Sequence, residues 1–149
     1  MDLDTLVKNL DCEKINYQNV NITGLSYNSK TTDDGNLFIC LVGENTDGHE
    51  YAKMAEENGA IALMVERKLD SDLPQILVKS TRHQIADVAD AFYNSPSKSI
   101  NLIGVTGTNG KTTVTHLIQK IFEDVNKRCA LIGTLGYKLN SKDSYREAK

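Results

Sequence analysis

Residues 104–113 read GVTGTNGKTT, a run in which glycines recur every third residue and lead into a Gly-Lys-Thr triplet. Glycines let the backbone curl so that several N–H groups point inward, and the positive end of a following helix adds to the attraction for anions. The run therefore predicts a loop that binds the phosphates of a nucleoside triphosphate. In loops of this kind the lysine, here Lys111, reaches the β- and γ-phosphates, and the next hydroxyl, Thr112, is a ligand of Mg²⁺.

The flanking sequence supports this prediction. Apolar residues at 100, 102, 103 and 105 predict a short strand before the loop, and apolar residues after it recur with helical spacing. These are Val114, Leu117, Ile118, Ile121, Phe122 and Val125. Cys129 to Ile132 predicts the next buried strand, so residues 99–134 are expected to form one β-loop-α-β unit. One position departs from the general phosphate-loop pattern, because Val105 stands where that pattern has its first glycine.

The residues before this unit predict a separate α/β domain. Apolar runs predict strands at 20–22, 37–42, 61–65 and 76–78, and helices are expected at 3–10, 50–58 and 81–92. Thr81 and Gln84 have the spacing of a capping box, and Gly59 stands where a helix C-cap glycine belongs. The polar segment Asn94-Ser95-Pro96-Ser97 marks the domain boundary. We therefore predict an α/β fold with a first domain at 1–97, of four or five strands and two or three helices, and a second at 98–149. The second domain is expected to be truncated, since 52 residues hold only one such unit.

Composition narrows the class of protein. The 149 residues are 40% hydrophobic and 25% charged, as in a globular protein. No apolar run approaches the length of a transmembrane helix, and the N-terminus lacks a signal-peptide pattern, so we expect a cytoplasmic protein with no membrane partner. The three cysteines form no Cys-x-x-Cys pair and the three histidines show no ligand spacing, which argues against disulfides and a zinc site. Neither His49 nor His116 is assigned a chemical role, and His116 is expected to be exposed to solvent.

Charge is distributed unevenly along the chain. Residues 1–97 hold 16 acidic and 8 basic side chains, whereas residues 98–149 hold 4 acidic and 9 basic ones. The basic residues are dispersed, aromatic residues are few, and no nucleic-acid-reading motif is present. A phosphate-bearing small ligand in the second half accounts for the sign of the charge, so no nucleic-acid partner is predicted.

Two blocks of sequence resemble the Mur ligase family, and within it the MurE group, which adds the third amino acid of the peptide. The first block contains Asn28-Ser29-Lys30, Gly35-Asn36-Leu37-Phe38 and Asp47-Gly48-His49. It is similar to the family pattern Asp-Ser-Arg, Gly-x-Leu-Phe and Asp-Gly-His, with Asn28 and Lys30 in place of the usual Asp and Arg. The second block is residues 104–113 followed, after one helix, by Gly133-Thr134-Leu135-Gly136-Tyr137.

The resemblance implies a small N-terminal substrate-binding domain followed by the first unit of a central P-loop ATPase domain. It implies an enzyme that uses ATP and Mg²⁺ to add L-lysine or meso-diaminopimelate to UDP-N-acetylmuramoyl-L-alanyl-D-glutamate through an acyl phosphate, in peptidoglycan synthesis. The resemblance places Lys111 in catalysis and Thr112 on the metal. The cofactor-binding residues it implies are Gly107, Thr108, Asn109, Gly110, Lys111, Thr112 and Thr113. Those implied for the uridine nucleotide are Tyr27, Ser29, Glu44, Asn45 and Thr46. Residues 1–149 alone are expected to be inactive.

Other readings stay open at this point. The MurF group of the same family has a similar first block, although the glycine loop and residues 133–137 favour MurE. Folylpolyglutamate synthetases share the loop but usually have glycine where this chain has Thr112. A non-catalytic nucleotide-binding module is an alternative from a different class. The oligomeric state is left undetermined.

Overall fold

The structure, a computed structural model, describes residues 1–146 and divides into two compact units. The first unit is Met1–Asn101, and the second begins at Leu102. The polar segment predicted as a boundary forms a turn in which Asn94 and Ser95 have φ angles of 58° and 50°, followed by the 3-10 helix η3 (Pro96–Ser99). The boundary between the two units therefore lies a few residues after this turn and its 3-10 helix.

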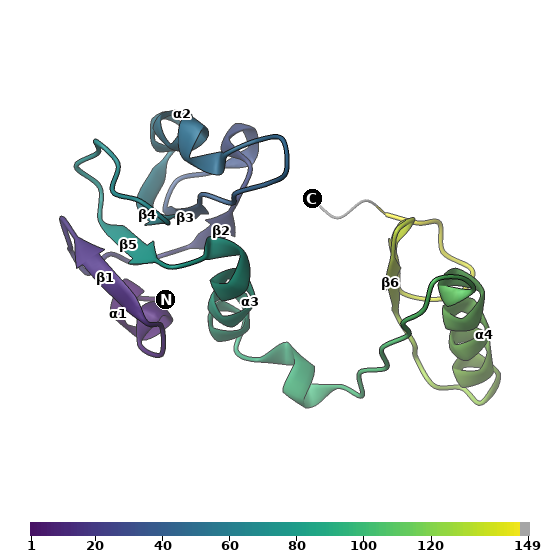
Figure 1. The fold of residues 1–149 in the computed structure, drawn as a ribbon. Helices are drawn as coiled ribbons and strands as arrows, with labels where there is room; N and C mark the ends of the chain where they lie inside the picture. The colour runs from purple at the N-terminus through teal and green to yellow at the C-terminus, as the bar shows by residue number, and fades with distance from the viewer. Residues whose placement is uncertain (147–149) are drawn as a thin grey trace. The chain divides into compact units, whose positions relative to one another are not determined.

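The first unit is built on a five-stranded sheet (Figure 1). Its strands are β1 (Cys12–Ile15), β2 (Gly24–Ser26), β3 (Asn36–Ile39), β4 (Ala60–Val65) and β5 (Gln75–Val78). Their order across the sheet is β1-β5-β4-β3-β2. Strands β2 to β5 are parallel, whereas β1 is antiparallel to β5. Because the four parallel strands run in one direction, the segments that follow them all leave from the same edge of the sheet.

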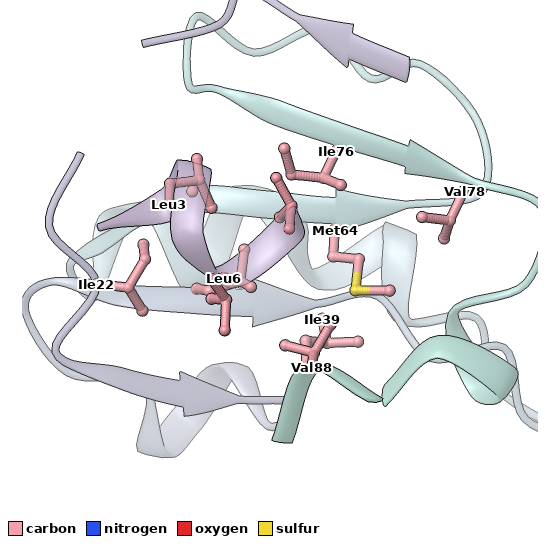
Figure 2. Close-up of a cluster of buried hydrophobic side chains, with 11 residues drawn as sticks. Leu3, Leu6, Ile22, Ile39, Met64, Ile76, Val78 and Val88 are labelled. Atoms are coloured by element: carbon pink, nitrogen blue, oxygen red, sulfur yellow. The ribbon is translucent and has the colours of Figure 1, made fainter. Parts of the chain in front are cut away.

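Helices cover both faces of this sheet. Helices α1 (Leu3–Val7) and α3 (Thr81–Phe92) lie on one face, and α2 (Ala52–Glu57) lies on the other (Figure 1). Successive strand residues alternate between the two cores, as the pleat of a strand requires. In β4, for example, Met64 packs with α1 and α3, whereas Leu63 packs with α2. Figure 2 shows the α1–α3 core, in which Leu3, Ile22 and Ile76 are fully buried.

The α/β prediction for the first unit is confirmed, with five strands and three α-helices. Strands β1 and β2 were not predicted, and the expected strand at 20–22 is only an isolated bridge between Asp2 and Asn21. The helix expected from residue 50 begins as the 3-10 helix η2 (Gly48–Tyr51) and continues as α2. Gly59, with φ of 104°, follows α2 in the left-handed region that favours glycine.

The predicted capping box at Thr81 is wrong. Helix α3 begins after Ser80, whose side chain makes no capping hydrogen bond. The Glu66 carboxylate, which comes from the end of β4, accepts instead from the Thr81 backbone N–H at 2.7 Å. An acidic side chain suits this position because a helix N-terminus carries unpaired N–H groups and positive potential. The cap is thus a tertiary contact that links the carboxyl ends of β4 and β5.

The second unit contains α4 (Lys111–Asp124) and a hairpin of β6 (Leu131–Gly133) and β7 (Gly136–Lys138). The strand predicted at 100–105 does not form, because these residues have no neighbouring strand to pair with within residues 1–146. Helix α4 forms as predicted, yet its apolar residues Val114, Leu117 and Ile121 are exposed. The strand expected at 129–132 forms only over 131–133, where Leu131 is buried but Ile132 is exposed, so the expectation that it is buried throughout is wrong.

Candidate functional site

The glycine loop precedes α4 as the sequence predicts. Gly107 and Gly110 have φ angles of 146° and 77°, in the region that side chains disfavour. A Cβ atom at Gly110 would meet nothing within 4 Å, so the backbone conformation, and not crowding, is what favours glycine there. Gly110 is the N-cap of α4, which places the loop at the positive end of a helix of 14 residues. The loop residues 106–110 and the first turn of α4 are exposed.

Lys111 folds back over this loop. Its ammonium group donates hydrogen bonds to the carbonyls of Gly107 and, at 3.3 Å, Thr108. Thr112 stands beside it at the exposed start of α4, and its carbonyl accepts from the His116 ring at 2.6 Å. The two residues predicted to serve the phosphates and the metal are therefore both exposed at the start of α4, directly after the loop.

His116 is half-buried, which corrects the expectation that it is exposed to solvent. Its Nδ1 atom donates to the Thr112 carbonyl, and its Nε2 atom lies 2.7 Å from the Tyr145 hydroxyl. Because Nδ1 bonds to a carbonyl, it carries a proton, and in the neutral ring Nε2 accepts from the tyrosine hydroxyl. The histidine thus joins the segment after β7 to the first turn of α4.

The residues predicted for the uridine nucleotide lie at one edge of the first unit's sheet. Tyr27 and Ser29 follow β2, and residues 44–46 follow β3, the neighbouring parallel strand. Tyr27 and residues 44–46 are exposed, whereas Ser29 is buried and its hydroxyl donates to the Met54 sulfur at 3.3 Å. Carboxyl ends of parallel strands are where open α/β sheets bind their ligands. The topology therefore brings the two predicted groups to a shared edge, with the Ser29 side chain turned inward.

A shallow pocket of about 330 Å³ lies over the loop after β3. Its lining residues are Val42, Gly43, Glu44, Asn45, Thr46, Asp47, Glu50 and Tyr51. All three predicted residues of this loop line the pocket, whereas Tyr27 and Ser29 do not.

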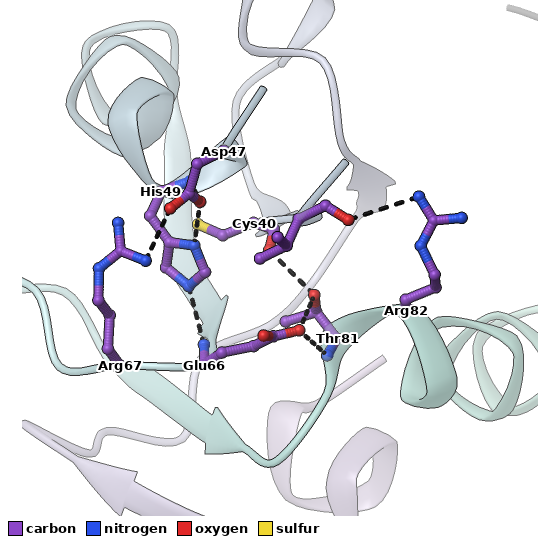
Figure 3. A network of polar contacts seen from close by, with 8 residues as sticks. Cys40, Asp47, His49, Glu66, Arg67, Thr81 and Arg82 are labelled. Atoms are coloured by element: carbon purple, nitrogen blue, oxygen red, sulfur yellow. Dashed lines mark hydrogen bonds and ion pairs between the residues drawn. The ribbon is translucent and has the colours of Figure 1, made fainter. Parts of the chain in front are cut away.

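A polar network lies beneath the loop (Figure 3). The Asp47 carboxylate accepts from the His49 backbone N–H at 2.9 Å, lies 2.5 Å from His49 Nδ1, and pairs with Arg67 at 2.7 Å. The His49 backbone N–H has the largest part in holding the pKa of the Asp47 carboxyl well below its usual range, and the His49 ring and the Arg67 guanidinium lower it further. The nearby Cys40 thiol is buried, which raises its pKa to about 12 and leaves it unreactive.

These contacts predict an acid-sensitive contribution to stability. A carboxyl whose pKa is lower in the folded chain stabilises the fold above its unfolded pKa of about 3.9, and this contribution is lost as pH falls. We expect Asp47→Asn to unfold at lower urea concentration than the wild type near neutral pH, and the difference to shrink below about pH 4. Urea midpoints of both chains across this range measure it. A difference that stays constant down to about pH 2.5 would contradict the assignment.

Comparison with known protein families agrees with this geometry. The family model of the Mur ligase middle domain matches residues 105–148, which contain the glycine loop and α4. A second model, described as the catalytic domain of the Mur ligase family, matches residues 21–93, which contain the sheet edge and its loop. The chain belongs to the Mur ligase family. The two matches cover residues 21–93 and 105–148, which contain the two blocks of motifs seen in the sequence.

Individual Mur ligases are similar over most of this chain. The UDP-N-acetylmuramoyl-L-alanyl-D-glutamate–2,6-diaminopimelate ligase of Bacillus licheniformis is 43% identical over 128 residues, which cover 86% of this chain and 26% of that protein. A solved structure of a ligase with the same name has a TM-score of 0.69 at 25% identity, covering 95% of this chain and 30% of the other. The MurF ligase of Thermotoga maritima, solved in complex with ADP, has a TM-score of 0.55 at 33% identity, covering 70% and 23%. The chain spans about a quarter of the length of the curated relatives it matches.

Sequence reasoning missed two residues of this polar network. Glu66 and Arg67 follow β4, and they reach His49, Thr81 and Asp47. Their signal in the sequence is a charged pair directly after a buried apolar run, at the carboxyl end of a strand.

None of the helices within residues 1–146 has the length and apolar character needed to cross a membrane.

Proposed function

We propose that this chain is the N-terminal part of an ATP-dependent ligase that joins an amino acid to UDP-N-acetylmuramoyl-L-alanyl-D-glutamate. The first unit would hold the uridine nucleotide end of this substrate, and the second would begin the ATP site. The observation that carries the proposal is the exposed glycine loop at the start of α4, with Lys111 and Thr112 side by side. The relative from Bacillus licheniformis is named for 2,6-diaminopimelate, which favours that amino acid over L-lysine.

The proposed chemistry needs no side-chain nucleophile. A free carboxylate is a poor electrophile, so the γ-phosphoryl group is first transferred from ATP to a carboxylate oxygen, which leaves ADP. The amine of the amino acid then attacks the carbonyl carbon, phosphate departs with the oxygen, and the nitrogen loses a proton as the amide forms. The protein contributes positioning and charge stabilisation. Lys111 and the N–H groups of residues 107–110 are suited to this, because phosphoryl transfer concentrates negative charge at the loop.

The residues present fit a bound magnesium ion. The Thr112 hydroxyl is exposed at the start of α4, and Mg²⁺ is usually held by one or two protein oxygens together with phosphates and water. Residues 1–146 contain no cluster of three acidic, histidine or cysteine side chains that could hold a metal without such partners. When bound, the ion would neutralise phosphate charge, with Thr112 as one of its ligands.

Amide chemical shifts of the isotope-labelled chain test both halves of the proposal. We expect UDP-N-acetylmuramoyl-L-alanyl-D-glutamate to shift the amides of Tyr27, Ser29 and residues 44–46, and ATP with Mg²⁺ to shift those of residues 107–113. Binding of the first ligand should be weak, since the chain covers only part of a relative's length. Shifts confined to other residues, or none up to millimolar ligand in a folded sample, would contradict the proposed sites.

A further inference from the structure

The loop that lines the pocket has few contacts of its own. Within it the Gly43 N–H donates to the Thr46 carbonyl at 2.8 Å, and at its base the Gly48 N–H donates to the Leu41 carbonyl at 2.9 Å. Residues 44–46 are exposed between these two bonds. A short exposed tip with one internal backbone hydrogen bond is held in place mainly from its ends. The position of the proposed nucleotide-binding residues therefore depends on what fixes Val42 and Asp47.

His49 fixes the Asp47 end. Its ring is buried, and both of its nitrogens have partners (Figure 3). The Glu66 backbone N–H donates to Nε2 at 2.8 Å, so Nε2 carries no proton. The ring proton is therefore on Nδ1, which lies 2.5 Å from an Asp47 carboxylate oxygen and donates to it. These partners assign one neutral tautomer to the ring, which joins the loop to the carboxyl end of β4.

Residues that follow β4 and β5 also contact the two segments at the base of the loop. The Thr81 hydroxyl lies within hydrogen-bond distance of both the Glu66 carboxylate, at 2.9 Å, and the Cys40 carbonyl, at 3.0 Å. Arg82 of α3 donates to the Val42 carbonyl at 3.4 Å, which is a long contact. Arg67 pairs with Asp47 from a half-exposed position, where ion pairs contribute little. Among these groups, His49 is the one that is buried, satisfied at both nitrogens and bonded directly to the loop.

We propose that His49 is a positioning residue for the nucleotide-sugar site: its neutral Nδ1–H imidazole bridges the Asp47 carboxylate and the Glu66 backbone amide and thereby holds residues 44–46 in the binding geometry. The inference rests on the proposed function for its ligand and on the described contacts for its mechanism. His49 does not line the pocket, so it acts on the substrate through the loop.

The test compares two histidine substitutions in chain 1–149. His49→Asn keeps a donor near Asp47 but leaves the Glu66 N–H without its acceptor, whereas His83→Asn changes an exposed histidine on α3 and is the matched control. We expect His49→Asn to weaken binding of UDP-N-acetylmuramoyl-L-alanyl-D-glutamate about tenfold, the effect of one buried hydrogen bond. The amides of residues 44–46 should gain fast motion in ¹⁵N relaxation while those of β3 to β5 keep their shifts. His83→Asn should match the wild type.

Two outcomes would overturn the proposal. One is unchanged affinity and unchanged loop relaxation in His49→Asn. The other is a ring ¹⁵N spectrum of the wild type that shows the proton on Nε2, a measurement that needs no variant and so decides the matter even if His49→Asn fails to fold. If the wild type binds no uridine substrate, the proposed function fails separately, and loop relaxation then decides whether His49 holds the loop.

Discussion

Replacing Lys111 with alanine is expected to lower turnover about a hundredfold or more in the proposed ligase that contains this chain. A preorganised group that stabilises developing phosphate charge contributes several kcal/mol to the barrier, and each 1.36 kcal/mol is tenfold in rate, so a loss of about this size follows. The side chain is exposed, and within residues 1–146 its ammonium group donates hydrogen bonds to carbonyls of its own loop alone. Its removal should therefore leave the fold intact, and initial-rate kinetics measures the loss.

Lys120→Ala is the matched control for this experiment. Lys120 lies on the same helix and is also exposed, but it pairs with Asp124 at 2.6 Å, away from the loop. An exposed pair of this kind contributes little to stability and does not touch the loop, so the rate should not change. The Lys111 variant should still show the amide shifts that the uridine substrate causes in the first unit. A near-normal rate for Lys111→Ala would show that this loop does not bind the ATP phosphates.

The first unit shows how far local sequence determines a fold. Strands β3, β4 and β5 were predictable because they are buried on both faces and so consist of continuous apolar runs. Strand β2 is three residues long, and β1 has an exposed Glu13 and Lys14, so neither has a comparable apolar run. Their pairing is set by neighbours far along the chain, as when Cys12 pairs with Val78. Short edge strands of this kind are therefore determined by tertiary contacts and not by the local sequence pattern.

The candidate site likewise has one part that local sequence predicts and one part that depends on the folded sheet. The glycine loop was predictable because its chemistry lies in ten consecutive residues, and the structure gives two of its glycines positive φ angles. The network beneath the other loop joins residues 47, 49, 66 and 81, which only the parallel sheet brings together. The Asp47-Gly48-His49 motif was visible in the sequence, yet the acceptor role of the His49 ring depends on the Glu66 amide. The predicted strand at 100–105 failed for a related reason, since it needs a neighbour to pair with.

The second large expected effect concerns Gly48, the middle residue of the Asp47-Gly48-His49 motif, because there is no room for a side chain at this position. An added Cβ atom would lie 2.6 Å from the Leu41 nitrogen, 2.8 Å from the Leu41 oxygen and 2.9 Å from the Cys40 carbonyl carbon. These are backbone atoms of the segment that leaves β3, so they can move only if the segment moves. We expect Gly48→Ala to destabilise the first unit by about 1–3 kcal/mol, the usual cost of overpacking. Urea unfolding followed by far-UV circular dichroism measures it.

Gly43→Ala separates this crowding from a general effect of adding a methyl group to the loop. At Gly43 the new Cβ atom would lie 3.3 Å from the Thr46 carbonyl and hydroxyl oxygens, a contact that a shift of a few tenths of an ångström in the exposed tip relieves. Its unfolding midpoint should therefore stay near that of the wild type. Equal midpoints for all three chains would show that the segments at 40–41 and 48 do not approach as closely as described. Loss of stability in Gly48→Ala alone would show that the base of the loop is packed against β3, which is the condition under which His49 can hold residues 44–46 in place.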